Sequence, residues 1–170
     1  MGIVRTKQLP KKKTGLSTYS IRDTKTWGMI IGIQGTSTMD EIYHPKSETY
    51  HSVKENLGFK MYLKRVIYEI KPKKWLTTYQ ELHSFEPRVV EVYGIADKTF
   101  YMKYINGINL QECINEKYYL QMLDILNNIY IFNQNKSQKF YHIDTKIQNF
   151  MVENDVVYLI DPDSFRFFNF

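Results

Sequence analysis

Apolar and polar residues alternate in short runs over roughly the first hundred residues, a pattern typical of β-strands. These runs are rich in aromatic and β-branched residues, which suit a pleated, half-buried surface. The sequence predicts strands at residues 27–33, 39–43, 59–70, 88–93 and 99–105. The turn GIQGTST would join the first two strands as a hairpin, and a turn at 94–98 would join the last two. The polar segment 44–58 favours no element.

Helical periodicity occurs in two places. Pro72 suits the first turn of a helix, and the apolar residues after it recur at helical spacing up to Phe85. These residues are Trp75, Leu76, Tyr79 and Leu82. After Asn106-Gly107 the period changes, and residues 116–132 predict a longer helix with one apolar face. That face consists of Tyr119, Met122, Leu123, Leu126, Ile129 and Tyr130.

The order of the elements predicts an α+β fold in two parts. Residues 26–105 would form a five-stranded sheet with one helix, and residues 106–170 a smaller, mostly helical part. A chain of 170 residues is long enough for one domain or for two small lobes around a shared cleft. No apolar run approaches the roughly 18 residues that cross a membrane, so we expect no membrane span.

Charge adds one feature to this picture, a flexible basic arm at residues 1–25. The formal net charge is +5, and much of it comes from Arg5, Lys7, Lys11, Lys12 and Lys13. Because no aromatic residues are interleaved with these, the arm is better interpreted as a solvated tail than as a site for nucleic acid or another polyanion. The single cysteine, Cys113, excludes a disulfide framework and a cysteine zinc site. With no secretory signal after the basic start, we expect a reducing, cytoplasmic location.

Two polar loops lie beside a predicted hairpin near the end of the chain. Short strands at 150–152 and 156–160 follow the loop HIDTKIQN and precede the segment DPD. Antiparallel pairing of these strands would bring Asn149 and Asp161 together. An amide oxygen and a carboxylate are hard ligands suited to Mg²⁺. This ion usually binds a protein through one or two carboxylates, and water molecules and substrate phosphates complete its coordination. The sequence therefore predicts a cation site that takes a polyphosphate.

The loop before the hairpin adds acid–base chemistry. Asp144 could accept the proton of an incoming hydroxyl group, and Lys146 could neutralise charge on a phosphoryl group in transfer. The pattern His142-x-Asp144-x-Lys146-x-x-Asn149 resembles the catalytic loop of protein kinases and kinase-like phosphotransferases. The segment LIDPD that ends at residue 163 is similar to their metal-binding Asp-Phe-Gly segment.

The resemblance implies ATP and Mg²⁺ or Mn²⁺ as cofactors and a two-lobed, protein-kinase-like fold with a five-stranded N-lobe sheet and a truncated C-lobe. In that family Asp144 and Lys146 would be catalytic, and Asn149 and Asp161 would bind the metal. Asp163 stands where the family has glycine, and the Asp-x-Asp of small-molecule phosphotransferases suggests that it is a further metal ligand.

The resemblance extends upstream and covers about residues 27 to 165. The segment FYMKYING (100–107) is similar to the last N-lobe strand and hinge of kinases, with Met102 at the gatekeeper position. Backbone groups of Lys103 and Ile105 would then contact adenine. The predicted helix at 75–85 resembles the single N-lobe helix, and the helix from 116 resembles the first long C-lobe helix.

The phosphate-binding residues are matched less closely. Gly32 and Gly35 resemble two of the three glycines of the phosphate loop. Lys64 occupies the position of the strand lysine that pairs with the phosphates, and Lys60 is its rival on the same face. Tyr62 stands where the family has alanine and would crowd adenine. Glu81 is the candidate helix partner of the lysine, with a solvated glutamate as the alternative.

The chain ends at Phe170, so we expect a minimal C-lobe without the activation segment that docks a peptide. The leading hypothesis is a kinase that transfers the γ-phosphoryl group to a hydroxyl, with Ser, Thr or Tyr of a protein as the expected acceptor. The alternative is a pseudokinase that acts as a protein-binding module, and a third hypothesis is a polyanion-binding protein that uses the basic arm. The tail SFRFFNF should be buried, either on its own C-lobe or in a homodimer through Phe165, Phe167, Phe168 and Phe170.

Overall fold

The structure is a computed structural model that describes residues 39–45, 48–66 and 71–169. Its fold is α+β, as predicted, with a five-stranded antiparallel sheet and two α-helices within those residues. The chain divides into two compact units. The first contains the described residues up to Thr77 and Val92–Tyr104, and the second contains Thr78–Glu91 and the described part of Ile105–Phe170. The predicted arm 1–25, the strand 27–33 and the loop glycines Gly32 and Gly35 lie outside the described residues.

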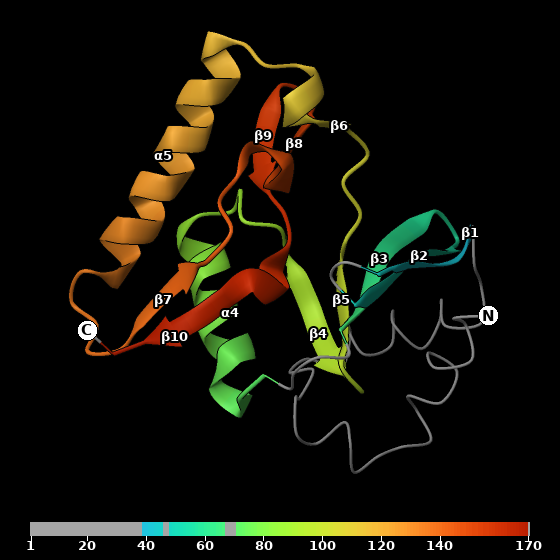
Figure 1. Cartoon of the computed structure of the whole chain (residues 1–170), viewed down its shortest axis with the longest axis horizontal. Coiled ribbons are helices and arrows are strands. Elements are labelled where there is room, and N and C mark those ends of the chain that lie inside the picture. Colours follow the sequence, from blue (N-terminus) through green and yellow to red (C-terminus); the bar gives the residue numbers. More distant parts are fainter. Residues whose placement is uncertain (1–38, 46–47, 67–70, 170) are drawn as a thin grey trace. The chain divides into compact units, whose positions relative to one another are not determined.

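The sheet of the first unit has the strand order β1-β2-β3-β5-β4, and every pairing in it is antiparallel (Figure 1). Its strands are β1 (Met39–His44), β2 (Thr49–Asn56), β3 (Phe59–Val66), β4 (Val92–Ala96) and β5 (Thr99–Lys103). β1 pairs with β2, which lies in the polar segment where no element was predicted. The prediction missed β2 because its buried positions include Thr49, Ser52 and Lys54, so that polar residues hide the alternation.

The hairpin of β4 and β5 differs from the predicted one. The predicted turn began at Gly94, but Gly94 is a buried residue within β4, where the register with β5 shifts between Val92 and Gly94. Glycine is common at such irregularities in strands. The turn is instead formed by Asp97 and Lys98, whose φ angles of 51° and 62° suit a two-residue hairpin loop.

The helix α4 (Lys73–Phe85) confirms the predicted helix that follows Pro72. Its residues up to Thr77 belong to the first unit and the rest to the second. The predicted apolar stripe is buried as a whole, with Trp75, Leu76, Tyr79 and Leu82 each at most 3% exposed. Trp75 contacts Phe100 of β5 edge to face, with 5.3 Å between the ring centroids. The stripe therefore explains why this segment is helical and which side of it is covered.

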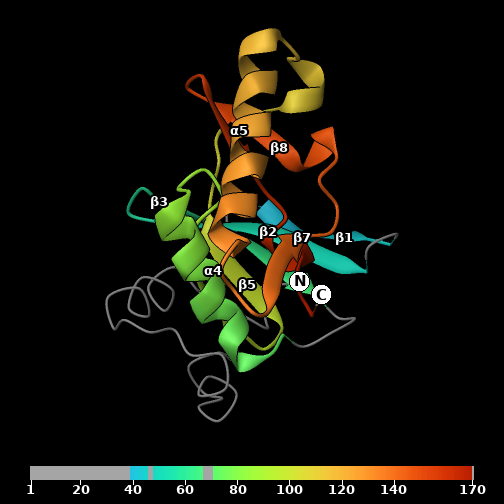
Figure 2. The same ribbon diagram turned by 90° about the vertical axis from the view of Figure 1, so that its left-hand side faces the viewer.

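The second unit combines one long helix, α5 (Glu116–Asn133), with two small sheets. In the first sheet, β10 (Phe165–Phe168) pairs with β7 (Lys139–His142). The second sheet has the strand order β6-β8-β9, with β6 at Ile108–Asn109, β8 at Phe150–Glu153 and β9 at Val156–Leu159. Figures 1 and 2 both show β7 beside the C-terminal part of α5 and the β8–β9 hairpin beside its N-terminal half. The β8–β9 hairpin was predicted, and a strand or turn packed on its own C-lobe was one of the two alternatives for the tail that forms β10. The strands β6 and β7 were not predicted.

The buried face of α5 is rotated relative to the predicted one. Met122 and Ile129 are buried as predicted, but Ile125 lies at the centre of the buried face. Three residues assigned to that face are exposed: Tyr119, Leu123 and Tyr130. The predicted and observed faces share Met122 and Ile129 but are centred in different directions, because the apolar residues of this helix extend beyond the face that is buried. No helix among the described residues is long and apolar enough to cross a membrane.

The aromatic tail forms β10 and packs within the second unit. Phe165 is fully buried and stacks on Phe140 of β7, with ring centroids 5.1 Å apart. Phe167 also contacts Phe140, at 4.8 Å, and Phe167 and Phe168 are half-buried. The tail is therefore covered by its own unit over these residues, and Phe170 lies outside the described residues.

Candidate active site

Two loops of the second unit carry the motif residues. The first loop follows β7 and leads through a 3₁₀ turn, Ile147–Asn149, into β8. The second follows β9 and leads through a 3₁₀ turn, Pro162–Ser164, into β10. The backbone N–H of Ile160 donates to the carbonyl of Asn149 at 2.8 Å, so the two loops leave the β8–β9 hairpin side by side.

His142 links the two loops. Its Nδ1 accepts a hydrogen bond from the backbone N–H of Asp144 at 3.0 Å. Its Nε2 donates to the carbonyls of Asp161 at 3.1 Å and Ile160 at 3.3 Å. Only the neutral ring with its proton on Nε2 can make both kinds of bond. Burial lowers the pKa of His142 in spite of the nearby charge of Asp161, which agrees with a neutral ring.

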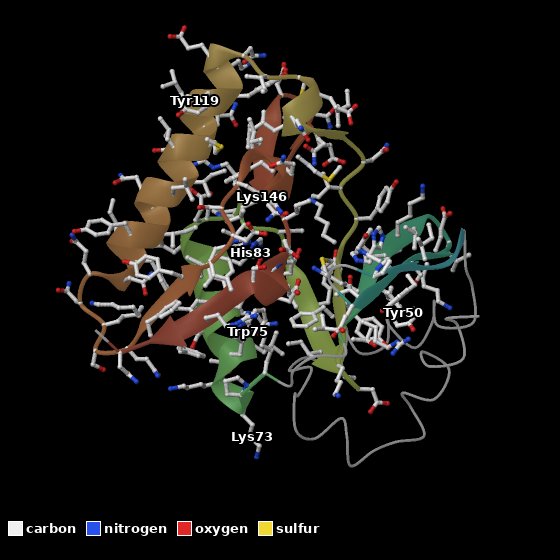
Figure 3. The ribbon with its side chains drawn as sticks, in the orientation of Figure 1. Tyr50, Lys73, Trp75, His83, Tyr119 and Lys146 are labelled. Carbon is white, nitrogen blue, oxygen red and sulfur yellow. The ribbon has the colours of Figure 1, made fainter. Side chains whose placement is uncertain are left out.

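Asp144 is held by its backbone rather than by its carboxylate. Its N–H bonds to His142, and its carbonyl accepts from Nδ2 of Asn149 at 2.6 Å. The carboxylate is 44% exposed and lies 3.5 Å from Nζ of Lys146, which is 58% exposed and labelled in Figure 3. An exposed pair of this kind contributes at most about 1 kcal/mol to stability. Both side chains therefore face solvent, where an acceptor could reach them.

Asn149 and Asp161 were predicted to bind a cation. Nδ2 of Asn149 donates to the carbonyl of Asp144, so this bond does not use Oδ1, the amide atom that a cation prefers. Asp161 has a left-handed backbone, with φ 67° and ψ 54°, and Ser164 Oγ donates to its Oδ2 at 2.6 Å. Aspartate tolerates this conformation better than most residues, and such positions are concentrated at functional sites.

Asp163 occupies a different environment from Asp161. It is 2% exposed, and its carbonyl accepts a hydrogen bond from Nη1 of Arg166. Burial raises the pKa of Tyr79 well above its usual value, and the nearby charges of Asp163 and Asp161 raise it further. Asp163 therefore lies among buried groups, and its role as a metal ligand stays a prediction.

The predicted metal ligands Asn149 and Asp161 offer one amide oxygen and one carboxylate. Among the described residues no three His, Cys, Asp or Glu side chains form a group that could hold a metal ion. A site made of the Asn149 amide and the Asp161 carboxylate needs no such group, because Mg²⁺ commonly completes its coordination with water and substrate phosphates. The residues present are thus the right chemical types for a magnesium–nucleotide complex.

The first unit contains the predicted nucleotide residues. Lys64 on β3 is 8% exposed, and Met102 on β5 is 4% exposed. Lys64 lies opposite Phe100, and Tyr62 lies opposite Met102, in the antiparallel pairing of β3 with β5. Opposite residues share a face, so Lys64, Tyr62 and Met102 lie on one face of the sheet.

The other candidates are distinguished by their exposure. Lys60, the rival of Lys64, is exposed and lies over the ring of Tyr104, with Nζ 5.0 Å from the centroid. Lys103 is exposed at the end of β5, whereas Ile105 is 7% exposed. Glu81 is exposed on α4, as its alternative interpretation predicted. Burial therefore favours Lys64 over Lys60, although it does not single out Lys64, since Lys54 and Lys71 are buried as well.

One contact on the Lys64 face was not predicted. The hydroxyl of Tyr62 hydrogen-bonds to Nδ1 of His51, and Nε2 of His51 bonds to Oγ1 of Thr49 at 2.8 Å. The sequence signal that could have indicated it was the large Tyr62 at a position where kinases have alanine. Ser164 was also missed, although it follows Asp163 directly.

No protein-family model matches the chain, and no curated protein is significantly similar to it. The functional interpretation therefore depends on the motif and on the contacts described above.

Proposed function

We propose that the chain is an ATP- and Mg²⁺-dependent phosphotransferase with a two-lobed, kinase-like fold. It transfers the γ-phosphoryl group to a hydroxyl acceptor, with Ser, Thr or Tyr of a protein as the acceptor class. The observation that supports this most is the network around His142, which joins the backbone of Asp144 to that of Asp161 while the Asp144 carboxylate stays accessible.

The proposed catalytic roles follow from exposure and charge. Asp144 orients the acceptor hydroxyl and takes its proton, because its carboxylate is accessible and its backbone is held at both N–H and carbonyl. Lys146, 3.5 Å from that carboxylate, places a positive charge where the phosphoryl group passes. The acceptor would enter from the solvent side of this pair.

The metal and nucleotide roles are assigned by donor type. Asn149 Oδ1 and the Asp161 carboxylate would hold Mg²⁺ or Mn²⁺, with Asp163 as a further candidate. When bound, the metal offsets the charge of the phosphates. Lys64 would pair with the phosphates, while Met102 and the backbone of Lys103 and Ile105 would contact adenine. Gly32 and Gly35 stay candidates for the phosphate loop.

A second candidate function is a pseudokinase that acts through protein contacts. The observation that favours it is the bond between Tyr62 and His51, since Tyr62 lies on the face that also holds Lys64 and Met102. With that bond in place, the tyrosine ring would occupy space that adenine needs. The fold would then be retained without turnover.

Nucleotide binding tests the proposal directly. Mg·ATP at a hundred times its dissociation constant should stabilise the protein by about 2.7 kcal/mol, which raises the melting temperature by roughly 5–10 °C for a chain of this size. Asp161→Asn should remove most of this shift, because asparagine tolerates the left-handed backbone but lacks the ligand charge.

The matched control is Asp155→Asn, in the hairpin turn. Asp155 also has a positive φ, and its Oδ1 accepts from the Tyr118 hydroxyl, a bond that asparagine can keep. This variant should retain the full Mg·ATP shift. No shift in the wild type with any nucleotide, with Mg²⁺ or Mn²⁺, would refute the proposal.

A further inference from the structure

The outward side of α5 carries a row of large apolar side chains in solvent. Five of them are 43–57% exposed, and they recur at the spacing of one helix face. They are Tyr119, Leu120, Leu123, Tyr130 and Ile131. Asn127 is exposed among them, and Tyr119 is labelled in Figure 3. We call this set the α5 face.

The α5 face is large enough to form an interface. A fully exposed side chain of this size presents on the order of 200 Å², so five that are half exposed offer on the order of 500 Å² in each copy. Apolar patches of that area on monomers are often functional. Together with polar neighbours, the face approaches the roughly 800 Å² per partner of a standard interface.

The positions of the α5 face are arranged symmetrically in sequence about position 125, whose own side chain is buried on the other side of the helix. Its exposed positions lie at equal distances along the chain on the two sides of that residue. The pairs are Leu123 with Asn127, Leu120 with Tyr130, and Tyr119 with Ile131. A second α5 laid antiparallel therefore sets apolar side chains against apolar side chains at both ends. A two-fold dimer requires this kind of surface, in which one patch binds its own copy.

Charge favours the antiparallel arrangement over the parallel one. Glu116 lies in the first turn of α5, and Lys136 follows its last turn, with Nζ 4.4 Å from the centroid of the Phe132 ring. Antiparallel packing brings Glu116 near Lys136 of the second copy, and it opposes the two helix dipoles. Parallel packing would place like charges and like helix ends together.

We propose that the α5 face binds a second copy of this chain, in a two-fold dimer with antiparallel α5 helices. Asn127 of each copy then lies opposite Leu123 of the other, near the centre, where a polar residue can select one register over its neighbours. The dimer does not use the aromatic tail, because Phe165 is buried against Phe140. It is also independent of the proposed phosphotransfer.

Solution mass tests the interface. At about 100 µM the wild type should have twice the mass of one chain, and Leu123→Glu should weaken dimerisation at least tenfold. Leu123 is 43% exposed, so a helical spectrum and a melting temperature like those of the wild type are expected for this variant. The control is Leu57→Glu, which changes a 98% exposed leucine in the turn between β2 and β3 and should leave the mass unchanged.

Disulfide trapping tests the orientation, in a Cys113→Ser background. A mixture of Leu120→Cys and Tyr130→Cys proteins should give the mixed disulfide, because those positions face each other across an antiparallel pair. Each variant alone should not cross-link. In an antiparallel dimer the same residue in the two copies is about 15 Å apart along the helix, which is beyond the reach of a disulfide. Cross-linking of each variant with itself would indicate parallel packing and overturn the proposal. So would a monomeric wild type, or a dimer that survives Leu123→Glu and is lost on deletion of residues 167–170.

Discussion

Replacing His142 by leucine should cost far more stability than the loss of one surface histidine. The ring is 8% exposed, and it makes one bond to the N–H of Asp144 and two to carbonyls after β9. Each net hydrogen bond contributes about 1 kcal/mol, and a buried N–H left without a partner costs about 1–3 kcal/mol. The edge-to-face contact of the ring with Phe165, at 5.1 Å, is partly kept by leucine. We therefore expect a loss of about 2–4 kcal/mol.

Urea unfolding at pH 7 measures this loss, as a lower midpoint with an unchanged slope. The melting temperature should fall by roughly 5–15 °C, at about 2–4 °C for each kcal/mol. The matched control is His83→Leu, since Nδ1 of His83 makes a single bond, at 2.7 Å, to the carbonyl of Val89. It should cost about 1 kcal/mol. If His142→Leu costs no more than His83→Leu, the ring does not hold the two loops together.

Two further predictions concern acid stability and nucleotide affinity. Burial acts to raise the pKa of Glu86, but its hydrogen bonds to Arg88 and Asn128 outweigh this and lower it below 4.5. A lowered pKa in the folded state means that the unfolded chain binds more protons, so this stabilisation is present above pH 4.5 and is lost as pH falls further. Glu86→Gln should therefore flatten the dependence of unfolding free energy on pH below 4.5, and an unchanged slope in urea titrations would contradict it. Tyr62→Ala should tighten ATP binding severalfold in calorimetry if Tyr62, which bonds His51, crowds adenine; weaker binding would mean that the ring contacts the nucleotide.

The sequence predicted the helices with a long apolar periodicity and the hairpin whose two strands are close together in the chain. The helices α4 and α5 follow from apolar spacing, and the β8–β9 hairpin follows from two short apolar runs on either side of a polar turn. Strand β2 could not be predicted, because polar residues take buried positions in it. The strands β7 and β10 form by pairing with each other across an intervening hairpin, which no local pattern encodes.

In the candidate site, too, the features within one loop were predicted, whereas contacts between distant parts of the chain were not. The spacing of Asp144, Lys146 and Asn149 lies within one loop and was visible in the sequence. The link from His142 to Asp161 joins residues far apart along the chain and depends on the fold. The contact between Tyr62 and His51 joins neighbouring strands, one of which was not predicted. Long-range contacts are thus the part of the site that required the structure.

Phosphate transfer by Asp144→Asn tests the central claim most directly. The backbone bonds of Asp144 do not involve its carboxylate, and the exposed pair with Lys146 contributes little, so unfolding free energy should change by less than about 1 kcal/mol. ATP affinity should stay nearly constant, while the rate of transfer from labelled ATP, with Mg²⁺ or Mn²⁺, to the protein itself or to a lysate should fall roughly a hundredfold or more. If the wild type binds ATP but transfers no more label than Asp144→Asn, the chain is a pseudokinase and the account of Asp144 as the catalytic base is wrong.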